Sequence, residues 1–226
     1  STDNSQDAMA IGPTATALGQ GSLAVGAGSG TALAGSTAVG TGAAALALDT
    51  TVIGAGANTS NAATNAVAIG YNAAAQGANA LSLGSTSMAN ASNAVAIGGN
   101  AVVTVAGTNS MALGANATAS QANSVALGAN ATASATNAVA LGSGSIADRA
   151  NTVSVGTAAA PRQVVNVAAG TQGTDAVNIT QLTGVTNMIG AGAGVNADGT
   201  IKKPSFTIGG QTYSDVGSAI TAAVSG

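Results

Sequence analysis

A four-residue phrase recurs along the first two thirds of the chain and constrains the fold more than any other feature. It consists of an aliphatic residue, a small residue, a second aliphatic residue and a glycine, as in Val125-Ala126-Leu127-Gly128. Successive copies begin 14 residues apart, except for two steps of 16, from residue 51 to 67 and from 95 to 111. A fixed period of this length predicts a solenoid, in which each repeat forms one coil and contacts only its neighbours.

Each repeat contains the pattern of two short strands separated by turns. In the repeat from Val125 to Ala138, alternating hydrophobicity marks a first strand that ends at Gly128. Asn130 suits a turn, because asparagine tolerates a positive φ, and residues 131–133 form a second strand. We therefore predict an all-β fold, a parallel β-roll whose coils stack about 4.8 Å apart. The two 16-residue coils are expected to hold their extra residues as bulges at coil corners.

The phase of the first strand leads to a hypothesis about which side chains fill the roll. The two aliphatic positions share one face of the strand, and we expect them to point into the interior. The small residue between them then points outward and stays small, which indicates close packing against another chain and hence an oligomer. The intersubunit packing residues expected in the roll are Ala68, Ala96, Ala112, Ala126 and Ala140.

In the second strand, the outer two positions are small and are expected to face inward, whereas the middle position varies. That variation indicates exposure to solvent and a candidate ligand-binding face. The residues we assign to this face are Thr16, Asn58, Met88, Thr118 and Thr132. Asparagine also recurs two positions before the phrase, from Asn65 to Asn151. Stacked at one turn, these asparagines can form a side-chain amide ladder and tolerate left-handed backbone geometry.

The composition argues against catalysis and against several classes of ligand. The chain has no histidine, cysteine or glutamate, so the bases and nucleophiles of most hydrolases are missing, and we expect no enzyme, metal or cofactor site. Only four residues are lysine or arginine, which predicts no nucleic-acid binding. Two glycine-rich stretches, residues 26–30 and 190–194, lack the strand and helix frame of a phosphate loop.

The pattern changes after Gly156. Thr174 or Asp175 is expected to cap a helix whose apolar residues follow spacings of 3, 4 and 3, which is typical of a coiled-coil seam. The seam consists of Ile179, Leu182, Thr186 and Ile189, and we assign trimer packing to Ile179, Leu182 and Ile189. Further on, Gly209-Gly210 lies between two strand-like segments and predicts a β-hairpin, and Asp215 is expected to cap a last helix.

Two stretches together resemble a known family. The Asn-Ser-Val-Ala-Leu-Gly phrase at residues 123–128 is similar to the head repeat, and residues 162–182 are similar to the neck, of the trimeric autotransporter adhesins, the YadA-like bacterial surface fibres. The resemblance covers nearly the whole chain. It implies a homotrimer of left-handed parallel β-rolls, followed by a neck, a short coiled coil and a small β/α stalk module. The corresponding boundaries are 1–158 for the head, 159–174 for the neck, 175–190 for the coiled coil and 191–226 for the module.

The resemblance also implies a function. We expect a fragment of a surface fibre, exported across the bacterial outer membrane, that adheres to host cells or extracellular matrix by multivalent binding. Membrane attachment is expected only through a C-terminal anchor that this fragment lacks. The alternative is a structural spacer or self-association module for autoaggregation or biofilm, without a specific receptor. A third class, ice binding, needs a regular threonine array, which Ala74, Met88, Val102 and Ile146 interrupt.

Overall fold

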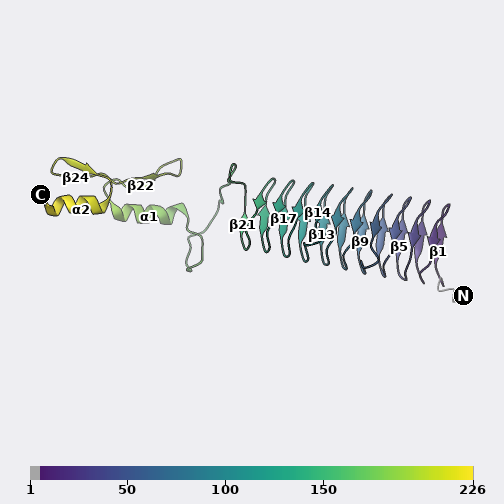
Figure 1. Cartoon of the computed structure of the whole chain (residues 1–226). Helices are drawn as coiled ribbons and strands as arrows, with labels where there is room; N and C mark the ends of the chain where they lie inside the picture. Colours follow the sequence, from purple (N-terminus) through teal and green to yellow (C-terminus); the bar gives the residue numbers. More distant parts are fainter. Residues whose placement is uncertain (1–5, 226) are drawn as a thin grey trace. The chain divides into compact units, whose positions relative to one another are not determined.

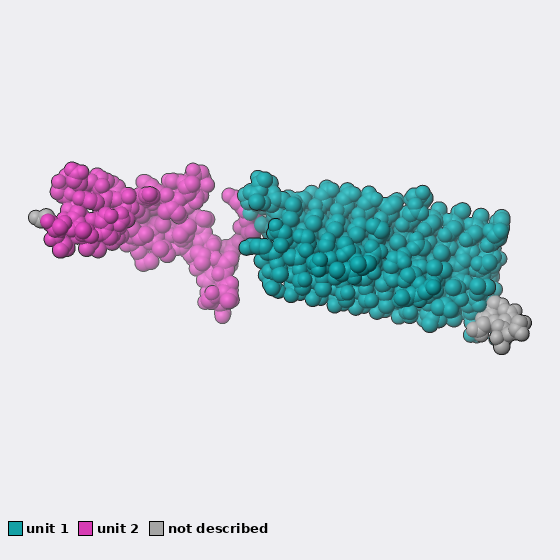
Figure 2. Space-filling model, in the orientation of Figure 1, with its two compact units in different colours: residues 1–162 teal, residues 163–226 magenta. Residues whose placement is uncertain are grey.

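The computed structural model describes residues 6–225; residues 1–5 and 226, at the ends of the predicted head and stalk module, lie outside the described residues. The chain divides into two compact units, residues 1–162 and residues 163–226 (Figure 2). Residues 159–162, which the sequence assigns to the neck, therefore belong to the first unit.

The first unit is a stack of coils that forms two parallel sheets (Figure 1), as the repeat predicts. Sheet A contains the phrase strands, β1 (Met9–Ile11), β3 (Leu23–Val25), β5 (Thr37–Val39), β7 (Thr51–Ile53), β9 (Val67–Ile69), β11 (Leu81–Leu83), β13 (Val95–Ile97), β15 (Met111–Leu113), β17 (Val125–Leu127), β19 (Val139–Leu141) and β21 (Val153–Ser154). Sheet B contains the second strand of each coil, β2 (Thr16–Ala17), β4 (Gly30–Thr31), β6 (Ala44–Ala45), β8 (Asn58–Thr59), β10 (Ala74–Ala75), β12 (Met88–Ala89), β14 (Val102–Val103), β16 (Thr118–Ala119), β18 (Thr132–Ala133) and β20 (Ile146–Ala147).

The two longer coils keep the register of both sheets. Thr51 pairs with Val67, and Val95 pairs with Met111, although 16 residues separate the partners. The extra residues lie in tight turns after the sheet B strands, closed by a hydrogen bond from the Ala63 amide to the Ser60 carbonyl at 3.1 Å in the first case. The predicted bulges at coil corners are confirmed, and they leave the stacked strands aligned.

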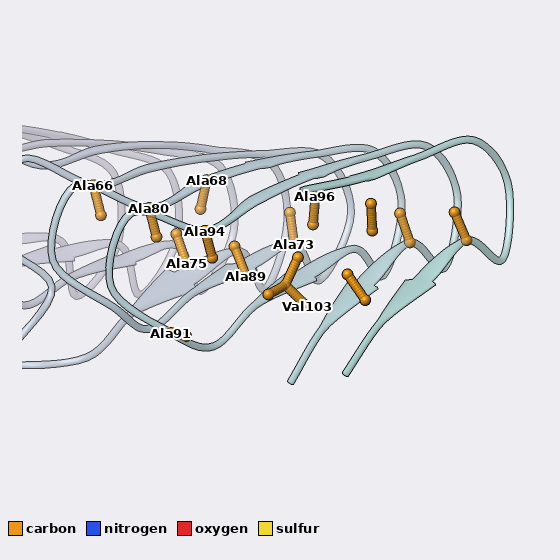
Figure 3. Packing of buried hydrophobic residues seen from close by; sticks show 14 of the residues in the cluster. Ala66, Ala68, Ala73, Ala75, Ala80, Ala89, Ala91, Ala94, Ala96 and Val103 are labelled. Atoms are coloured by element: carbon orange, nitrogen blue, oxygen red, sulfur yellow. The ribbon is translucent and has the colours of Figure 1, made fainter. Parts of the chain in front are cut away.

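The interior of the roll corrects the predicted phase of the first strand. The small residue in the middle of each phrase points inward, and Ala68 and Ala96 are fully buried within a single chain. The same holds for the other expected intersubunit residues, Ala112, Ala126 and Ala140, so none of the five can contact a partner. Figure 3 shows alanine side chains of the core cluster inside the coils.

The physical reason is the narrowness of the roll. Sheets A and B lie so close together that valine, at Val52 and Val103, is the largest fully buried side chain among the described residues. Longer aliphatic side chains do not fit and lie outside, with Ile11 53%, Leu83 40% and Leu127 37% exposed. In sheet B the predicted phase is confirmed, because Ala73 and Ala75 are buried on either side of the half-exposed Ala74.

The turns explain the glycine and asparagine positions of the repeat. The phrase glycine takes a positive φ, as at Gly98 (+128°), and a Cβ there would lie 2.6 Å from the backbone of Gly114 in the next coil. Only glycine permits this close stacking of turns. The repeated asparagines before the phrase also adopt positive φ, for example 56° at Asn93, as the sequence predicts.

The second unit contains two helices and two small hairpins. Helix α1 (Ile179–Ile189) is capped by Asn178, whose side-chain oxygen accepts a hydrogen bond from the Gln181 amide at 3.1 Å. The prediction that Thr174 or Asp175 caps this helix is therefore wrong. The strands β22 (Gly194–Val195) and β23 (Ile201–Lys202) pair, as do β24 (Phe206–Ile208) and β25 (Gln211–Tyr213), and α2 (Val216–Ser225) ends the unit. The predicted hairpin at Gly209-Gly210 is confirmed. Asp215 caps α2 as predicted, because its carboxylate accepts a hydrogen bond from the Ser218 amide at 2.8 Å.

Candidate functional site

The outward side of sheet A is the most apolar surface of the first unit. It consists of two parallel files, formed by the first and the third residue of each phrase, and we call it the aliphatic face. Met9, Ile53, Met111 and Leu141 on this face are each at least 39% exposed in the single chain. Soluble proteins rarely expose a contiguous apolar surface of this extent unless another molecule covers it. The face therefore has the character of an assembly surface.

The outward side of sheet B carries the residues that the sequence assigns to a ligand face. All five lie in the variable file, on β2, β8, β12, β16 and β18, and all are half-buried or exposed. Thr118 and Thr132 are direct neighbours in the register of β16 and β18. Asn58 is held in place, because its Oδ1 accepts from Gln76 Nε2 at 2.6 Å. The arrangement offers a flat row of small polar and apolar groups.

The predicted asparagine ladder is present at the corner that leads from sheet B back to sheet A. Each Nδ2 donates to the Oδ1 of the asparagine one coil further on, with N–O distances between 2.9 and 3.4 Å. The ladder comprises Asn65, Asn79, Asn93, Asn109, Asn123, Asn137 and Asn151. These bonds run parallel to the stack, so they tie neighbouring coils together and stiffen the roll.

Arg162 closes the end of the first unit, a role that the sequence did not reveal. Its guanidinium donates to the Val155 carbonyl and to Ser145 Oγ, both at 2.7 Å, and also to the Ser143 carbonyl. In earlier coils, the carbonyls equivalent to those of Ser143 and Val155 accept hydrogen bonds from backbone amides of the following coil. The Ala129 carbonyl, for example, accepts a hydrogen bond from the Gly144 amide. The guanidinium thus replaces the donors of a coil that does not follow.

Beside Arg162, the end of the roll has a cavity of about 730 Å³. Its lining combines aliphatic residues, among them Ile146, Val153 and Pro161, with the charged residues Asp148, Arg149 and Arg162. Val153 is 65% exposed, so the last phrase continues the aliphatic face to the end of the roll. This end of the roll is therefore a mixed apolar and charged surface.

The segment before α1 is ordered by side chains that bind its backbone. Gln181 both accepts from the Gly170 amide and donates to the Gly170 carbonyl, each at 2.9 Å. Asp175 accepts from the amides of Thr171 and Gln172, and these hydrogen bonds lower the pKa of its carboxyl. The apolar side chains of the segment stay outside; Val164, Val165, Val177 and Ile179 are 60–69% exposed. They form another apolar surface that is open in the single chain.

Among residues 6–225 no three acidic, histidine or cysteine side chains gather in a way that suits a metal ion. Within the same residues, neither helix has the length and hydrophobicity needed to cross a bilayer. The surfaces described above are suited to contacts with other macromolecules.

Comparison with known proteins finds matches along most of the chain. The model of the YadA head domain repeat matches residues 4–29, 34–57, 45–73, 62–87, 75–101, 106–131 and 133–159, and the model of the coiled stalk of trimeric autotransporter adhesins matches residues 163–204. Together these matches cover well over half of the chain. The chain belongs to the trimeric autotransporter adhesin family. The family and its fold are structural and non-enzymatic, and its members assemble as trimers.

Two relatives of this chain are informative. The crystal structure of the collagen-binding domain of the Yersinia adhesin YadA is similar with a TM-score of 0.64 and 31% identity, over 80% of this chain and 98% of that domain. The autotransporter adhesin EhaG of Escherichia coli O157:H7 is 49% identical over 53 residues, which is 22% of this chain. The matched part is 3% of the length of EhaG.

The sequence alone predicted the repeat, the ladder and the outward file of sheet B. It missed the aliphatic face, because it placed large side chains inside. One signal was available: the middle residue of the phrase is alanine or serine in ten of eleven copies, a restriction that fits a narrow interior equally well. No sequence signal marked Arg162 as the cap of the roll.

Proposed function

We propose that this chain is the head, neck and start of the stalk of a trimeric fibre on the bacterial surface, exported across the outer membrane, which adheres to host cells or extracellular matrix. The observation that carries the proposal is the contrast between the outward sides of the two sheets of the roll. Sheet A presents an aliphatic face suited to partner subunits, whereas sheet B presents a smaller, more polar file suited to solvent and ligand.

Assembly of the head uses the aliphatic face in this proposal. Ile97 of one chain packs against the same face of two further copies, in place of the alanines that the sequence suggested. The helix seam continues the assembly beyond the neck through Ile179, Leu182 and Ile189, of which Ile179 and Ile189 are 60% and 41% exposed. Burying such side chains stabilises the trimer by about 1.5–3 kcal/mol each.

Ligand binding uses the outward file of sheet B, with Thr16, Asn58, Met88, Thr118 and Thr132 as contact residues. Three rolls present three copies of the file, so weak individual contacts add up to high avidity. The described part of the head has no charged side chain between Asp49 and Asp148, which favours a ligand recognised by hydrogen bonds and apolar contact. The YadA domain with the same fold is a collagen-binding domain, so collagen is the first matrix ligand to test.

A binding assay tests the adhesion proposal. The trimer is applied to immobilised collagen, other matrix proteins and a cell layer, and compared with a Thr118→Asp/Thr132→Asp variant. We expect the variant to lose binding about tenfold or more while remaining trimeric, because each chain loses its contact and avidity multiplies the loss. A matched variant, Ala115→Asp/Ala129→Asp, places the same charges on the neighbouring turn file. Equal binding by the wild type and both variants would contradict the assignment of ligand binding to the outward file of sheet B.

One observation favours the alternative of a self-association module. The uncharged surface between Asp49 and Asp148 offers little electrostatic repulsion between fibres. In that case, beads coated with the trimer aggregate without any added ligand, and the sheet B variant that abolishes collagen or cell binding leaves aggregation intact. If the sheet B variant loses both aggregation and ligand binding, both activities are assigned to the outward file of sheet B.

A further inference from the structure

The aliphatic face has one interruption. The third position of the phrase is aliphatic in every coil, and the first position is aliphatic in nine of eleven. The two exceptions are Thr37 on β5 and Thr51 on β7, and they are direct neighbours in the register of sheet A. We call this pair the threonine layer. Both side chains are half-buried in the single chain, beside Val39 and Ile53 of the same strands.

Covering the face changes the surroundings of these hydroxyl groups. When partner subunits pack against sheet A, each hydroxyl leaves bulk water and needs a hydrogen-bond partner, because an unpaired buried polar group is costly. Three chains at the same height bring equivalent threonines together, so that hydroxyl groups and trapped water can satisfy one another. A chain displaced along the stack would bury the hydroxyls against aliphatic side chains such as Val67 or Leu81.

Register is a real difficulty for this head. The phrase repeats every 14 residues, so the aliphatic face looks nearly the same after a shift of one coil, about 4.8 Å along the stack. Apolar contacts alone therefore distinguish poorly between aligned and shifted chains. Polar residues within an apolar seam are a known means of specifying register in coiled coils, where a single buried asparagine has this effect. The threonine layer is the corresponding irregularity in the roll.

We propose that Thr37 and Thr51 of three chains form a hydrated polar layer that specifies the axial register of the trimeric head. The inference rests on the proposed function, because it requires the aliphatic face to be covered by two further copies of this chain. The layer lies on the third and fourth strands of sheet A, whereas the neck follows β21 at the other end of the sheet. It thus acts in the half of the head that is farther from the neck along the stack.

A mixing experiment tests the layer. A variant with the layer moved by two coils, Thr37→Val/Thr51→Val/Val67→Thr/Leu81→Thr, is co-expressed with the wild-type chain under different tags, and native mass spectrometry counts the mixed trimers. We expect mixed trimers to fall about tenfold or more below binomial proportions, because mismatched layers leave hydroxyls unpaired. The control variant Thr118→Val/Thr132→Val alters the equivalent pair on sheet B, and it should mix with the wild type in binomial proportions.

The outcomes separate the register proposal from the assembly proposal. If the moved-layer variant and the wild-type chain form mixed trimers in binomial proportions, the proposal that the threonine layer specifies register is wrong. If that variant does not fold, Thr37→Val/Thr51→Val is compared with the sheet B control, and an equal change in melting temperature overturns the layer. Ile97→Asp serves as the separate test of the interface. An unimpaired Ile97→Asp trimer contradicts the aliphatic face itself, whereas a disrupted one combined with binomial mixing contradicts only the layer.

Discussion

Sheets A and B share one backbone plan but differ in what they present outward. Both are parallel, both stack coil by coil, and both point alanine-sized side chains into the same interior. Outside, sheet A carries two files of Met, Leu, Ile and Val, interrupted only by Thr37 and Thr51, whereas sheet B carries one file of small and mixed residues. In a roll this thin the interior contributes little specificity, so the outward residues decide which side assembles and which side remains open.

The largest expected effect comes from a charge placed on sheet A. Ile97→Asp should prevent assembly or lower the melting temperature strongly, because a carboxylate of each chain would be buried in the interface at a cost of about 3 kcal/mol or more. Val102→Asp, on the outward side of sheet B in the same coil, should leave the trimer intact. Light scattering distinguishes the trimer from the 20.7 kDa chain. Similar losses in both variants would erase the contrast between the sheets.

The next effect concerns the shared interior. Ala96→Leu should destabilise the roll by about 3 kcal/mol, because the interior has no room for the added atoms and the backbone must shift. Ala74→Leu, on the outward side of sheet B, should be nearly neutral. Thermal unfolding followed by circular dichroism gives both values. A tolerated Ala96→Leu would mean that the interior is wider than its buried side chains indicate.

A smaller effect is expected where the two sheets end together. Arg162→Met should destabilise the last coil by about 1–3 kcal/mol, because the Val155 and Ser143 carbonyls lose charge-assisted hydrogen bonds. Hydrogen exchange should increase in β19 to β21 and stay unchanged in β1 to β9. Arg149→Met, which removes an equal charge from the same end, is the control. Uniform exchange along the roll would argue against a local cap.

The smallest effect is a gain at the corner between the sheets. Asp49 occupies the ladder position one coil before Asn65, with a φ of 55°, but its carboxylate has no N–H to donate to Asn65 Oδ1. Asp49→Asn should extend the ladder by one rung and stabilise the roll by about 1 kcal/mol. Asp148→Asn makes the same change of charge away from the ladder. Equal melting temperatures for Asp49→Asn and wild type would show that the ladder contributes little.

Particular residues show how far the sequence leads. The register of Thr51 with Val67 and the positive φ of the ladder asparagines follow from spacing and residue type, because both depend on the local chain. The cap at Asn178 was missed, since Thr174, Asp175 and Asn178 are all competent capping residues and only the folded segment around Gln181 selects among them. Arg162 was missed because its acceptors are up to 19 residues away in the chain.

The sequence by itself determined the coil length, the stack of parallel strands, the turn positions and the absence of histidine, cysteine and glutamate. Each follows from a repeat period or from residue types that are present or missing. Only the tertiary structure decided which side of β9 or β13 faces inward. Alternation along a strand allows two phases, and the distance between the two sheets selects one of them. Because that distance admits alanine but not isoleucine, the side chains that look like a core became the surface through which the chains assemble in our proposal.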